Sequence, residues 1–322
     1  MITSALHIRP FIPCTADYAT LVAIDISAWS GEPVSQEVLQ HDDQIWDQQY
    51  LRTRLIVEYQ GQGIAYAQYS ETPWAYQPNK YFLKIMVLPV YQRQGIGSLL
   101  YQQITTELVQ RGACLFTATT REDQIHAIGF LQRRGFHRVI RELESRLDVT
   151  TFDHHRFQPT VERVKESGIR IVSVQELQTI DAEWLRKLWE LNWAVVPDMP
   201  TSEEFTRETL DDFQEGITSP QLRLDALFVA IDTATGQWIG LSGVHMYLED
   251  RDTLYVGHTG VLRSYRRRGI ALALKVSTIV WSQQYGARVI VGENEESNPM
   301  YLLNEKLGFR YSHAWLGYEK EV

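Results

Sequence analysis

A weak internal repeat with a domain-sized spacing constrains the fold of this chain more than any other feature. The segment QRQGIG at residues 92–97 recurs as RRRGIA at residues 266–271, so Gly95 and Gly269 lie 174 residues apart. Further glycines follow in the same order in both copies, at Gly112 and Gly286 and then in the pairs Gly135-Phe136 and Gly308-Phe309. Solenoid repeats are only about 20–50 residues long, so this spacing predicts two copies of a whole domain. A chain of 322 residues is also longer than one ordinary core needs.

The hydrophobic pattern predicts the same elements around each glycine segment. Apolar stretches and turn residues predict a β-hairpin in each half, at Arg54–Tyr59 and Ile64–Tyr69 and at Leu227–Ile231 and Trp238–His245. A strand then runs into each glycine segment, at Tyr81–Leu88 and Leu254–Leu262, and a helix with apolar residues at helical spacing follows it. We therefore predict domains at residues 1–150 and 169–322, joined by a polar linker that contains Pro159.

Composition and charge exclude several classes of protein. The net charge of −9 argues against binding to nucleic acid, which needs a basic surface, and is compatible with a cationic substrate such as an amine. No stretch approaches the roughly 18 apolar residues of a membrane span, and residues 1–10 lack a signal-peptide pattern, so we expect a cytoplasmic protein without a membrane partner. Cys14 and Cys114 lack metal-site spacing, so we expect no metal site and two buried, reduced thiols.

Each glycine segment predicts an anion-binding turn. It lies between a strand and a helix, where the first helical turn has unpaired backbone N–H groups and the positive end of the helix dipole. Glycine lets the backbone approach a phosphate closely and adopt dihedral angles that other residues resist, a role that fits Gly95, Gly97 and Gly269, with Ala271 as the counterpart of Gly97. The spacing fits neither a Rossmann dinucleotide site nor a P-loop, which needs Gly-Lys-Ser/Thr.

Residues 87–97, VLPVYQRQGIG, resemble the acetyl-CoA motif (Q/R)-x-x-G-x-(G/A) of the GNAT superfamily, entered from its fourth strand. Residues 259–271 resemble the same motif again, and residues 127–136 and 298–309 are similar to the family's second cofactor-contacting helix. The resemblance implies an α/β (α+β) fold with two tandem GNAT domains, each a mixed, mostly antiparallel sheet flanked by helices. The tandem arrangement is similar to that of mycothiol synthase-like proteins.

The resemblance also implies a cofactor and a reaction. It implies an acetyl-CoA-dependent N-acetyltransferase that transfers the acetyl group directly to the amine of a small molecule or peptide. The pyrophosphate of acetyl-CoA would lie on the backbone N–H groups of residues 94–97 and 268–271, and a backbone N–H of the fourth strand would polarise the thioester carbonyl. The residues that the resemblance places at the cofactor are Val87, Gln92, Gln94, Gly95, Ile96, Gly97, Val261, Arg266, Arg268, Gly269, Ile270, Ala271, Asn294, Asn298 and Asn304.

The sequence departs from the family at the residue that protonates the leaving thiolate. Many members have a tyrosine four residues before the glycine of Gly-Phe, where this chain has Leu131 and Asn304. Tyr301, one helical turn before Asn304, is a candidate substitute, with a packing role as the alternative. His258 and Glu293 are candidates for the catalytic base, and a structural role is the alternative for the histidine.

The two halves differ in the polar residues near the second motif. The amides of Asn294, Asn298 and Asn304 suit either contacts to the cofactor or the capping of turns, whereas the first half has Thr119, Thr120 and Arg121 in that region. We therefore predict that the second half carries out the chemistry and that the first half binds acetyl-CoA or has partly degenerated. The alternatives are a non-catalytic CoA-binding or sensing protein and an O-acyltransferase that uses another acyl-CoA. The acceptor, the number of active sites and the oligomeric state stay open.

Overall fold

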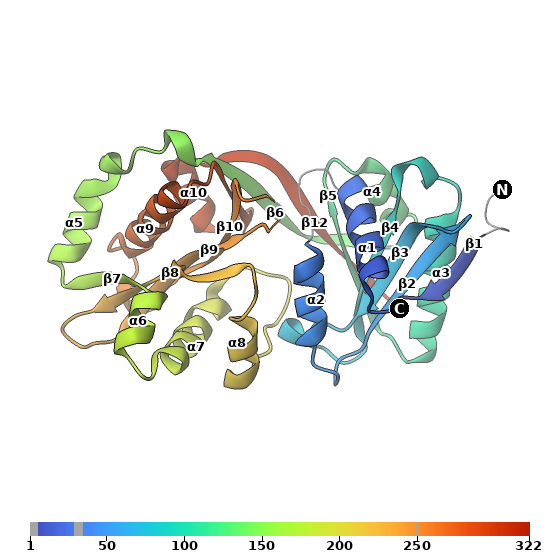
Figure 1. Ribbon diagram of the computed structural model, residues 1–322, viewed down its shortest axis with the longest axis horizontal. Helices are drawn as coiled ribbons and strands as arrows, with labels where there is room; N and C mark the ends of the chain where they lie inside the picture. The colour runs from blue at the N-terminus through green and yellow to red at the C-terminus, as the bar shows by residue number, and fades with distance from the viewer. Residues whose placement is uncertain (1–5, 29–34, 249) are drawn as a thin grey trace. The chain divides into compact units, whose positions relative to one another are not determined.

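The computed structural model describes residues 6–28, 35–248 and 250–322, which form two compact units (Figure 1). The first unit comprises the described residues of 1–141 together with 202–206 and 315–322, and the second comprises 142–201 together with the described residues of 207–314. Each unit contains a mixed sheet and helices, which confirms the predicted α/β (α+β) fold class. None of the described helices is long and apolar enough to cross a membrane.

The sheet of the first unit has the strand order β1-β2-β3-β4-β5-β12. Strands β1 to β4 pair antiparallel, β4 and β5 pair parallel, and β12 pairs antiparallel with β5. The predicted hairpin is therefore β2 and β3, and the predicted strand before the glycine segment is β4. The elements are β1 (Leu6–Pro10), α1 (Thr15–Ala28), α2 (Gln36–Gln44), β2 (Arg52–Tyr59), β3 (Gln62–Ser70), η2 (Pro73–Ala75), β4 (Lys80–Val87), η3 (Pro89–Tyr91), α3 (Ile96–Gln110), β5 (Leu115–Arg121), α4 (Ile125–Gln132) and, from the end of the sequence, β12 (Arg310–Glu321).

Strand alternation divides the side chains of the first unit between two cores. Ile56 on β2 packs with Leu21 and Ile24 of α1, whereas its neighbour Val57 packs with Leu100 of α3. Because successive side chains of a strand point to opposite faces, α1 and α3 cover opposite faces of the sheet. The first unit thus has a helix-covered core on each side of the strands that lead to the glycine turn.

The second unit repeats this arrangement in the order β6-β11-β10-β9-β8-β7. Strands β7 to β10 pair antiparallel, β10 and β11 pair parallel, and β6 pairs antiparallel with β11. The elements are β6 (His137–Asp148), η4 (Val149–Thr151), η5 (His154–Phe157), α5 (Gln158–Glu166), β7 (Ile169–Ser173), α6 (Val174–Ile180), α7 (Trp184–Val195), η6 (Val196–Asp198), α8 (Leu210–Gly216), β8 (Leu222–Asp232), β9 (Trp238–Met246), β10 (Thr253–Val261), η7 (Arg263–Tyr265), α9 (Ile270–Tyr285), β11 (Val289–Glu295) and α10 (Pro299–Leu307).

The core of the second unit is split by its sheet in the same way. Val229 on β8 packs with Leu188 of α7, whereas its neighbour Ala230 packs with Leu274 of α9. Helices α7 and α9 therefore cover opposite faces of the sheet. The helix predicted after the second glycine segment is α9, and it ends at Gly286, whose φ of +91° is the left-handed conformation expected of a helix-ending glycine.

The last strand of each sequence repeat pairs with a strand of the other repeat. Residues Trp315 to Glu321 of β12 pair with Arg121 to Leu115 of β5 in the first unit. Residues Glu142 to Asp148 of β6 pair with Glu295 to Val289 of β11 in the second unit. Each unit is therefore completed by a strand that follows the other repeat's Gly-Phe pair.

The segment predicted as a polar linker contains a helix. Helix α5 spans Gln158–Glu166, with Pro159 in its first turn, where the missing N–H of proline is not needed. Val161 and Val164 pack against the start of α9, in the core that contains Ile270. Two apolar residues in nine give too little periodicity to predict a helix, so only the contact with α9 explains why this segment is ordered.

Candidate active site

The two glycine segments form nearly identical turns. Gly95 caps α3 with a φ of +90°, and Gly269 caps α9 with a φ of +87°. Two residues earlier, Arg93 and Arg267 also have left-handed φ values, of 62° and 65°. Left-handed backbone is costly for arginine, so this conformation indicates a functional constraint on the turn, one that the sequence analysis missed. Neither helix start has a side-chain cap, which leaves the first-turn N–H groups available to an anion.

A pocket of about 930 Å³ lies beside the first glycine turn, and this volume suits a small-molecule ligand. Strands β4 and β5 pair only from Lys80 to Phe82, and the pocket lies where they have separated. Of the predicted cofactor residues in this half, the pocket is lined by Val87, Gln92, Gly95, Ile96 and Gly97.

The two glutamines of the first turn are anchored to the backbone. The Gln92 Nε2 donates to the carbonyl of Val87 at 3.1 Å, and the Gln94 Nε2 donates to the carbonyl of Val90 at 3.1 Å. Gln94 is absent from the pocket lining. Both side chains therefore hold the turn in shape, and the anion-binding groups at this turn are backbone N–H groups.

The first pocket also contains a charged network that the sequence analysis missed. Asp25 of α1 is buried and lines the pocket with Lys84 of β4. Tyr66 donates to the Asp25 carboxylate at 2.6 Å, and the Lys84 Nζ lies 3.1 Å from it. Burial and the nearby carboxylate raise the pKa of Tyr66 well above its usual value. The network places a fixed, partly neutralised carboxylate in the pocket, from a helix whose sequence gave no sign of a site.

The arginines of the second turn form hydrogen bonds and ion pairs with other groups of the chain. The Arg266 Nε donates to the carbonyl of Val261 at 2.9 Å, which repeats the contact of Gln92 with Val87. Arg266 and Arg263 both pair with Asp198, and these hydrogen bonds lower the pKa of Asp198 to about 2. Arg268 donates to the carbonyl of Ser264 at 3.2 Å. Two of the three consecutive arginines thus stabilise the turn.

Helix α5 lies directly against the second turn. A Cβ atom added at Gly269 would lie 2.8 Å from the Cγ2 atom of Thr160 and 3.4 Å from an Arg163 nitrogen. The start of α9, at Gly269, Ile270 and Ala271, therefore packs against α5, beside Arg163 and Val164. The second turn has the same backbone shape as the first, but side chains of α5 occupy the space next to its glycine.

Titratable groups gather where β10 and β11 separate. The two strands pair only from Thr253 to Tyr255, and Glu293 lies two residues beyond the last pair on β11. Burial raises the pKa of Glu293 to about 7, with a smaller contribution from the carboxylates of Glu142 and Glu144, although a hydrogen bond with Tyr255 opposes it. A carboxyl group with this pKa can accept a proton near neutral pH.

Two histidines lie on β10 and β9, close to the point where β10 and β11 separate. His258 lies in the irregular part of β10 between Val256 and Thr259. Desolvation by the surrounding protein lowers its pKa, although part of the side chain is exposed to solvent. His245 on the neighbouring strand β9 also has a lowered pKa, because of burial and the proximity of His258. Tyr301 lies on α10, and among the described residues no hydrogen bond or ion pair joins its side chain to Glu293 or His258.

The three predicted asparagines make mostly structural contacts. Asn304 is buried, and its Nδ2 donates to Oδ1 of Asn294 at 2.7 Å. Asn298 caps α10 by accepting from the N–H of Met300 at 2.9 Å. The Oδ1 atom of Asn304 is buried without a hydrogen-bond partner in the described structure, so one acceptor remains for a ligand.

Lys275 is a buried cation that the sequence analysis treated only as an interruption of an apolar run. It lies on α9, is 3% exposed, and its Nζ is 5.8 Å from the centroid of the Phe309 ring. Burial lowers the pKa of Lys275 to about 8. Its counterpart 174 residues earlier is Tyr101, which lines the first pocket.

The two cysteines are not buried, contrary to the sequence-based expectation. Both Cys14 and Cys114 are exposed free thiols. Cys14 lies just before α1 and Cys114 just before β5, so both thiols lie at the ends of connecting segments. Within residues 6–28, 35–248 and 250–322, no three side chains of His, Cys, Asp or Glu are grouped so as to hold a metal ion.

Comparison with known proteins links these turns to a family. A family model described as Acetyltransferase (GNAT) family matches residues 21–136 and 185–309. Both matched segments include one of the two glycine turns and most of the strands around it. A search among curated proteins gave no match to the sequence.

Several solved structures share the fold over nearly the whole chain. A tandem GNAT protein from the clavulanic acid biosynthesis pathway has 17% identity and a TM-score of 0.76 over 98% of each chain. A GCN5-related N-acetyltransferase from Sphaerobacter thermophilus has 16% identity and a TM-score of 0.72 over 100% of this chain and 97% of its own. A fungal GCN5-related glucosamine N-acetyltransferase region has 14% identity and a TM-score of 0.72 over 97% of this chain and 38% of its own. At these identities the likeness is one of fold.

Proposed function

The chain belongs to the GNAT acetyltransferase family as a tandem protein, and from this premise we propose that it transfers the acetyl group of acetyl-CoA to an amine of a small molecule or peptide. Family membership gives an acyl-CoA-dependent acyltransferase; the acetyl donor and the amine acceptor are our proposal. The observation that carries it is the pocket of about 930 Å³ beside the uncapped turn at Gly95.

The residues present fit acetyl-CoA at the first turn. Backbone N–H groups of residues 94–97 bind the pyrophosphate, because they are unpaired and stand at the positive end of α3. The opening between β4 and β5 holds the rest of the cofactor, with Val87 at its edge. When bound, acetyl-CoA supplies an activated thioester. By the same reasoning we assign residues 268–271, with the Oδ1 atom of Asn304, to a second cofactor in the second unit.

We assign the proton transfer to the second unit. An amine attacks only in its neutral form, so a base must take a proton from the acceptor. Glu293 has a pKa of about 7 and lies past the point where β10 and β11 separate, whereas the first unit has Thr119 and Thr120 in that region. Glu293 is therefore the base in this proposal, and His258 lines the approach.

Calorimetric titration of acetyl-CoA tests the two cofactor assignments. Gly97→Trp places an indole in the first pocket, where a Cβ atom meets only the Phe130 ring at 3.5 Å, and Ala271→Trp is the matched change in the second unit. Thermal unfolding establishes that each variant is folded. We expect each variant to lose one site. Loss of binding only in Gly97→Trp would overturn the second cofactor site and the role of Glu293 with it.

Turnover with a panel of amines tests the reaction itself. Release of free CoA thiol, followed with a thiol reagent, is expected with acetyl-CoA and at least one amine. Acyl-CoAs of increasing chain length, added as competitors, test the preference for acetyl. A wild type that binds no acetyl-CoA contradicts the proposal, and binding without turnover favours a non-catalytic CoA-binding protein.

A further inference from the structure

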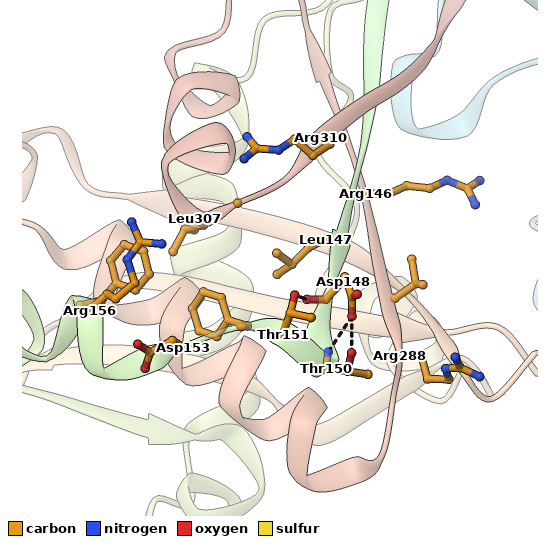
Figure 2. Close-up of a pocket in the computed structure, with 14 residues that line it drawn as sticks. Arg146, Leu147, Asp148, Thr150, Thr151, Asp153, Arg156, Arg288, Leu307 and Arg310 are labelled. Atoms are coloured by element: carbon orange, nitrogen blue, oxygen red, sulfur yellow. Dashed lines mark hydrogen bonds between the residues drawn. The ribbon is translucent and has the colours of Figure 1, made fainter.

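A second cavity lies in the second unit, at the far end of its sheet from the glycine turn. Its volume is about 630 Å³ (Figure 2). It is formed where β6 ends, where β11 and β12 begin, and at the C-terminal end of α10. Four arginines from separate segments of the chain line it: Arg146, Arg156, Arg288 and Arg310. This concentration of positive charge occurs in a chain of net charge −9.

The two aspartates of the cavity mainly accept hydrogen bonds from the turns that follow them; hydrogen bonds from Thr150 and, more weakly, the charge of Arg288 lower the pKa of Asp148. The Asp148 carboxylate accepts from the N–H of Thr150 at 2.9 Å and from its hydroxyl at 2.6 Å. The Asp153 carboxylate accepts from the N–H of His155 at 3.0 Å. Both carboxylates are used in capping short 3-10 turns, and neither forms an ion pair with an arginine of the cavity in the described structure.

Two of the arginines have no acidic partner. Arg146 pairs with Glu144 at 2.8 Å, and Arg288 lies 3.9 Å from Asp252. In contrast, the side chains of Arg156 and Arg310 have no hydrogen bond or ion pair to any residue that the structure describes. Figure 2 shows these two side chains on the same side of the cavity, on either side of Leu307. Their guanidinium groups therefore have free donors for one shared anion.

An apolar wall adjoins the two free arginines. Phe152 and Phe157 stack with ring centroids 5.6 Å apart and line the cavity together with Leu147 and Leu307. All four side chains belong to the same buried core. A ligand that reaches both the arginines and this wall needs an anionic end and an apolar or aromatic body.

The cavity is separate from the proposed cofactor site. Val289 at the start of β11 lines the cavity and pairs with Thr253 at the start of β10, whereas the glycine turn follows the other end of β10 at Val261. At about 3.3 Å per residue, the nine-residue strand separates the two by on the order of 25 Å.

We infer that this cavity binds a phosphate monoester with an apolar or aromatic body, whose phosphate lies between Arg156 and Arg310. A phosphate dianion suits paired guanidinium groups, because each can donate two parallel hydrogen bonds to its oxygens. The inference stands apart from acetyl transfer, since it uses no residue of the glycine turns or of the strand opening.

Phenyl phosphate is the probe for this site, and phenol is its uncharged control. Isothermal titration is made with saturating acetyl-CoA present, so that the glycine turns are not offered to the probe. The variant Arg156→Gln/Arg310→Gln removes both free guanidinium groups. Arg111→Gln/Arg186→Gln is the matched control, because it removes two exposed arginines elsewhere.

We expect phenyl phosphate, and not phenol, to bind the wild type, with an affinity that falls as NaCl is added. The Arg156→Gln/Arg310→Gln variant should bind at least roughly tenfold more weakly, since two charge-assisted contacts are lost, while the matched control and the affinity for acetyl-CoA stay unchanged. The inference is overturned if the wild type does not bind the probe under these conditions, or if the double variant binds it equally well.

Discussion

Asn304 on α10 donates a hydrogen bond to Asn294 on β11 at 2.7 Å, at a point where Asn304 is only 1% exposed. Removing the acceptor leaves a buried amide without a partner, which costs about 1–3 kcal/mol. We therefore expect Asn294→Ala to lower the free energy of unfolding by that amount in urea titrations. Adding Asn304→Leu, which places the first-half residue at this position, should recover part of the loss. Equal losses in the single and double variants would show that the hydrogen bond is not the cause.

Glu293 should control the pH dependence of activity. As a base it acts when deprotonated, so activity is expected to rise with pH through about 7, where its carboxyl group titrates. Glu293→Gln should lower kcat/KM by roughly 100-fold or more and remove this rise. Glu295→Gln, on the same strand, is the control, because that carboxylate binds Ser297 at 2.8 Å. An unchanged pH profile in Glu293→Gln would exclude it as the base.

The same substitution should also stabilise the fold. The pKa of Glu293 is about 7 in the folded chain against 4.5 in an ordinary glutamate, so stability from this group is present below pH 4.5 and is lost as the pH rises to about 7. At pH 8, Glu293→Gln should therefore raise the free energy of unfolding by on the order of 1–3 kcal/mol. At pH 4 the wild type and the variant should be nearly equal. A variant that is less stable at pH 8 would contradict the raised pKa.

Lys275 should destabilise the second unit at neutral pH. Its pKa of about 8 is below the usual 10.5, so the folded chain holds this proton less tightly than the unfolded chain. The stability penalty is complete below pH 8 and disappears as the pH rises to 10.5. Lys275→Met, which preserves the volume, is expected to raise the free energy of unfolding at pH 7 by roughly 1–3 kcal/mol and by less at pH 10. A loss of stability at pH 7 would indicate an interaction of the ammonium group.

Gly269 should tolerate a side chain poorly for two separate reasons. Its φ is +87°, and an added Cβ atom would meet Thr160 at 2.8 Å. Gly286 at the other end of α9 has a similar φ of +91°, and an added Cβ atom there would meet no other atom within 4 Å. Substitution of Gly286 therefore measures the cost of the left-handed backbone conformation alone. We expect Gly286→Ala to cost about 1 kcal/mol in thermal or urea unfolding, and Gly269→Ala to cost more. Thr160→Ala should remove the excess cost of Gly269→Ala if the contact with α5 is its source.

The sequence predicts the elements of this fold well and its long-range contacts poorly. The hairpins, the strands before the turns and α9 follow from alternation, helical spacing and glycine positions, all of which are local. Asp25 and Lys84 meet in the first pocket from separate elements, and nothing in the sequence around Asp25 marks it. The arginines of the cavity with Arg156 and Arg310 come from four separate segments, so no segment alone reveals it.

The exchange of β6 and β12 makes the completion of the first unit depend on a strand that is distant in the sequence. Strand β5 at Leu115 pairs with Glu321, about 200 residues later, so its edge stays open until β12 has been synthesised. A fragment that ends at residue 150 would carry β6 without β11 and would leave β5 with an unpaired edge. The two repeats therefore cannot be separated by a cut in the segment between them, and a ribosome-bound first half would need protection from aggregation until β12 arrives.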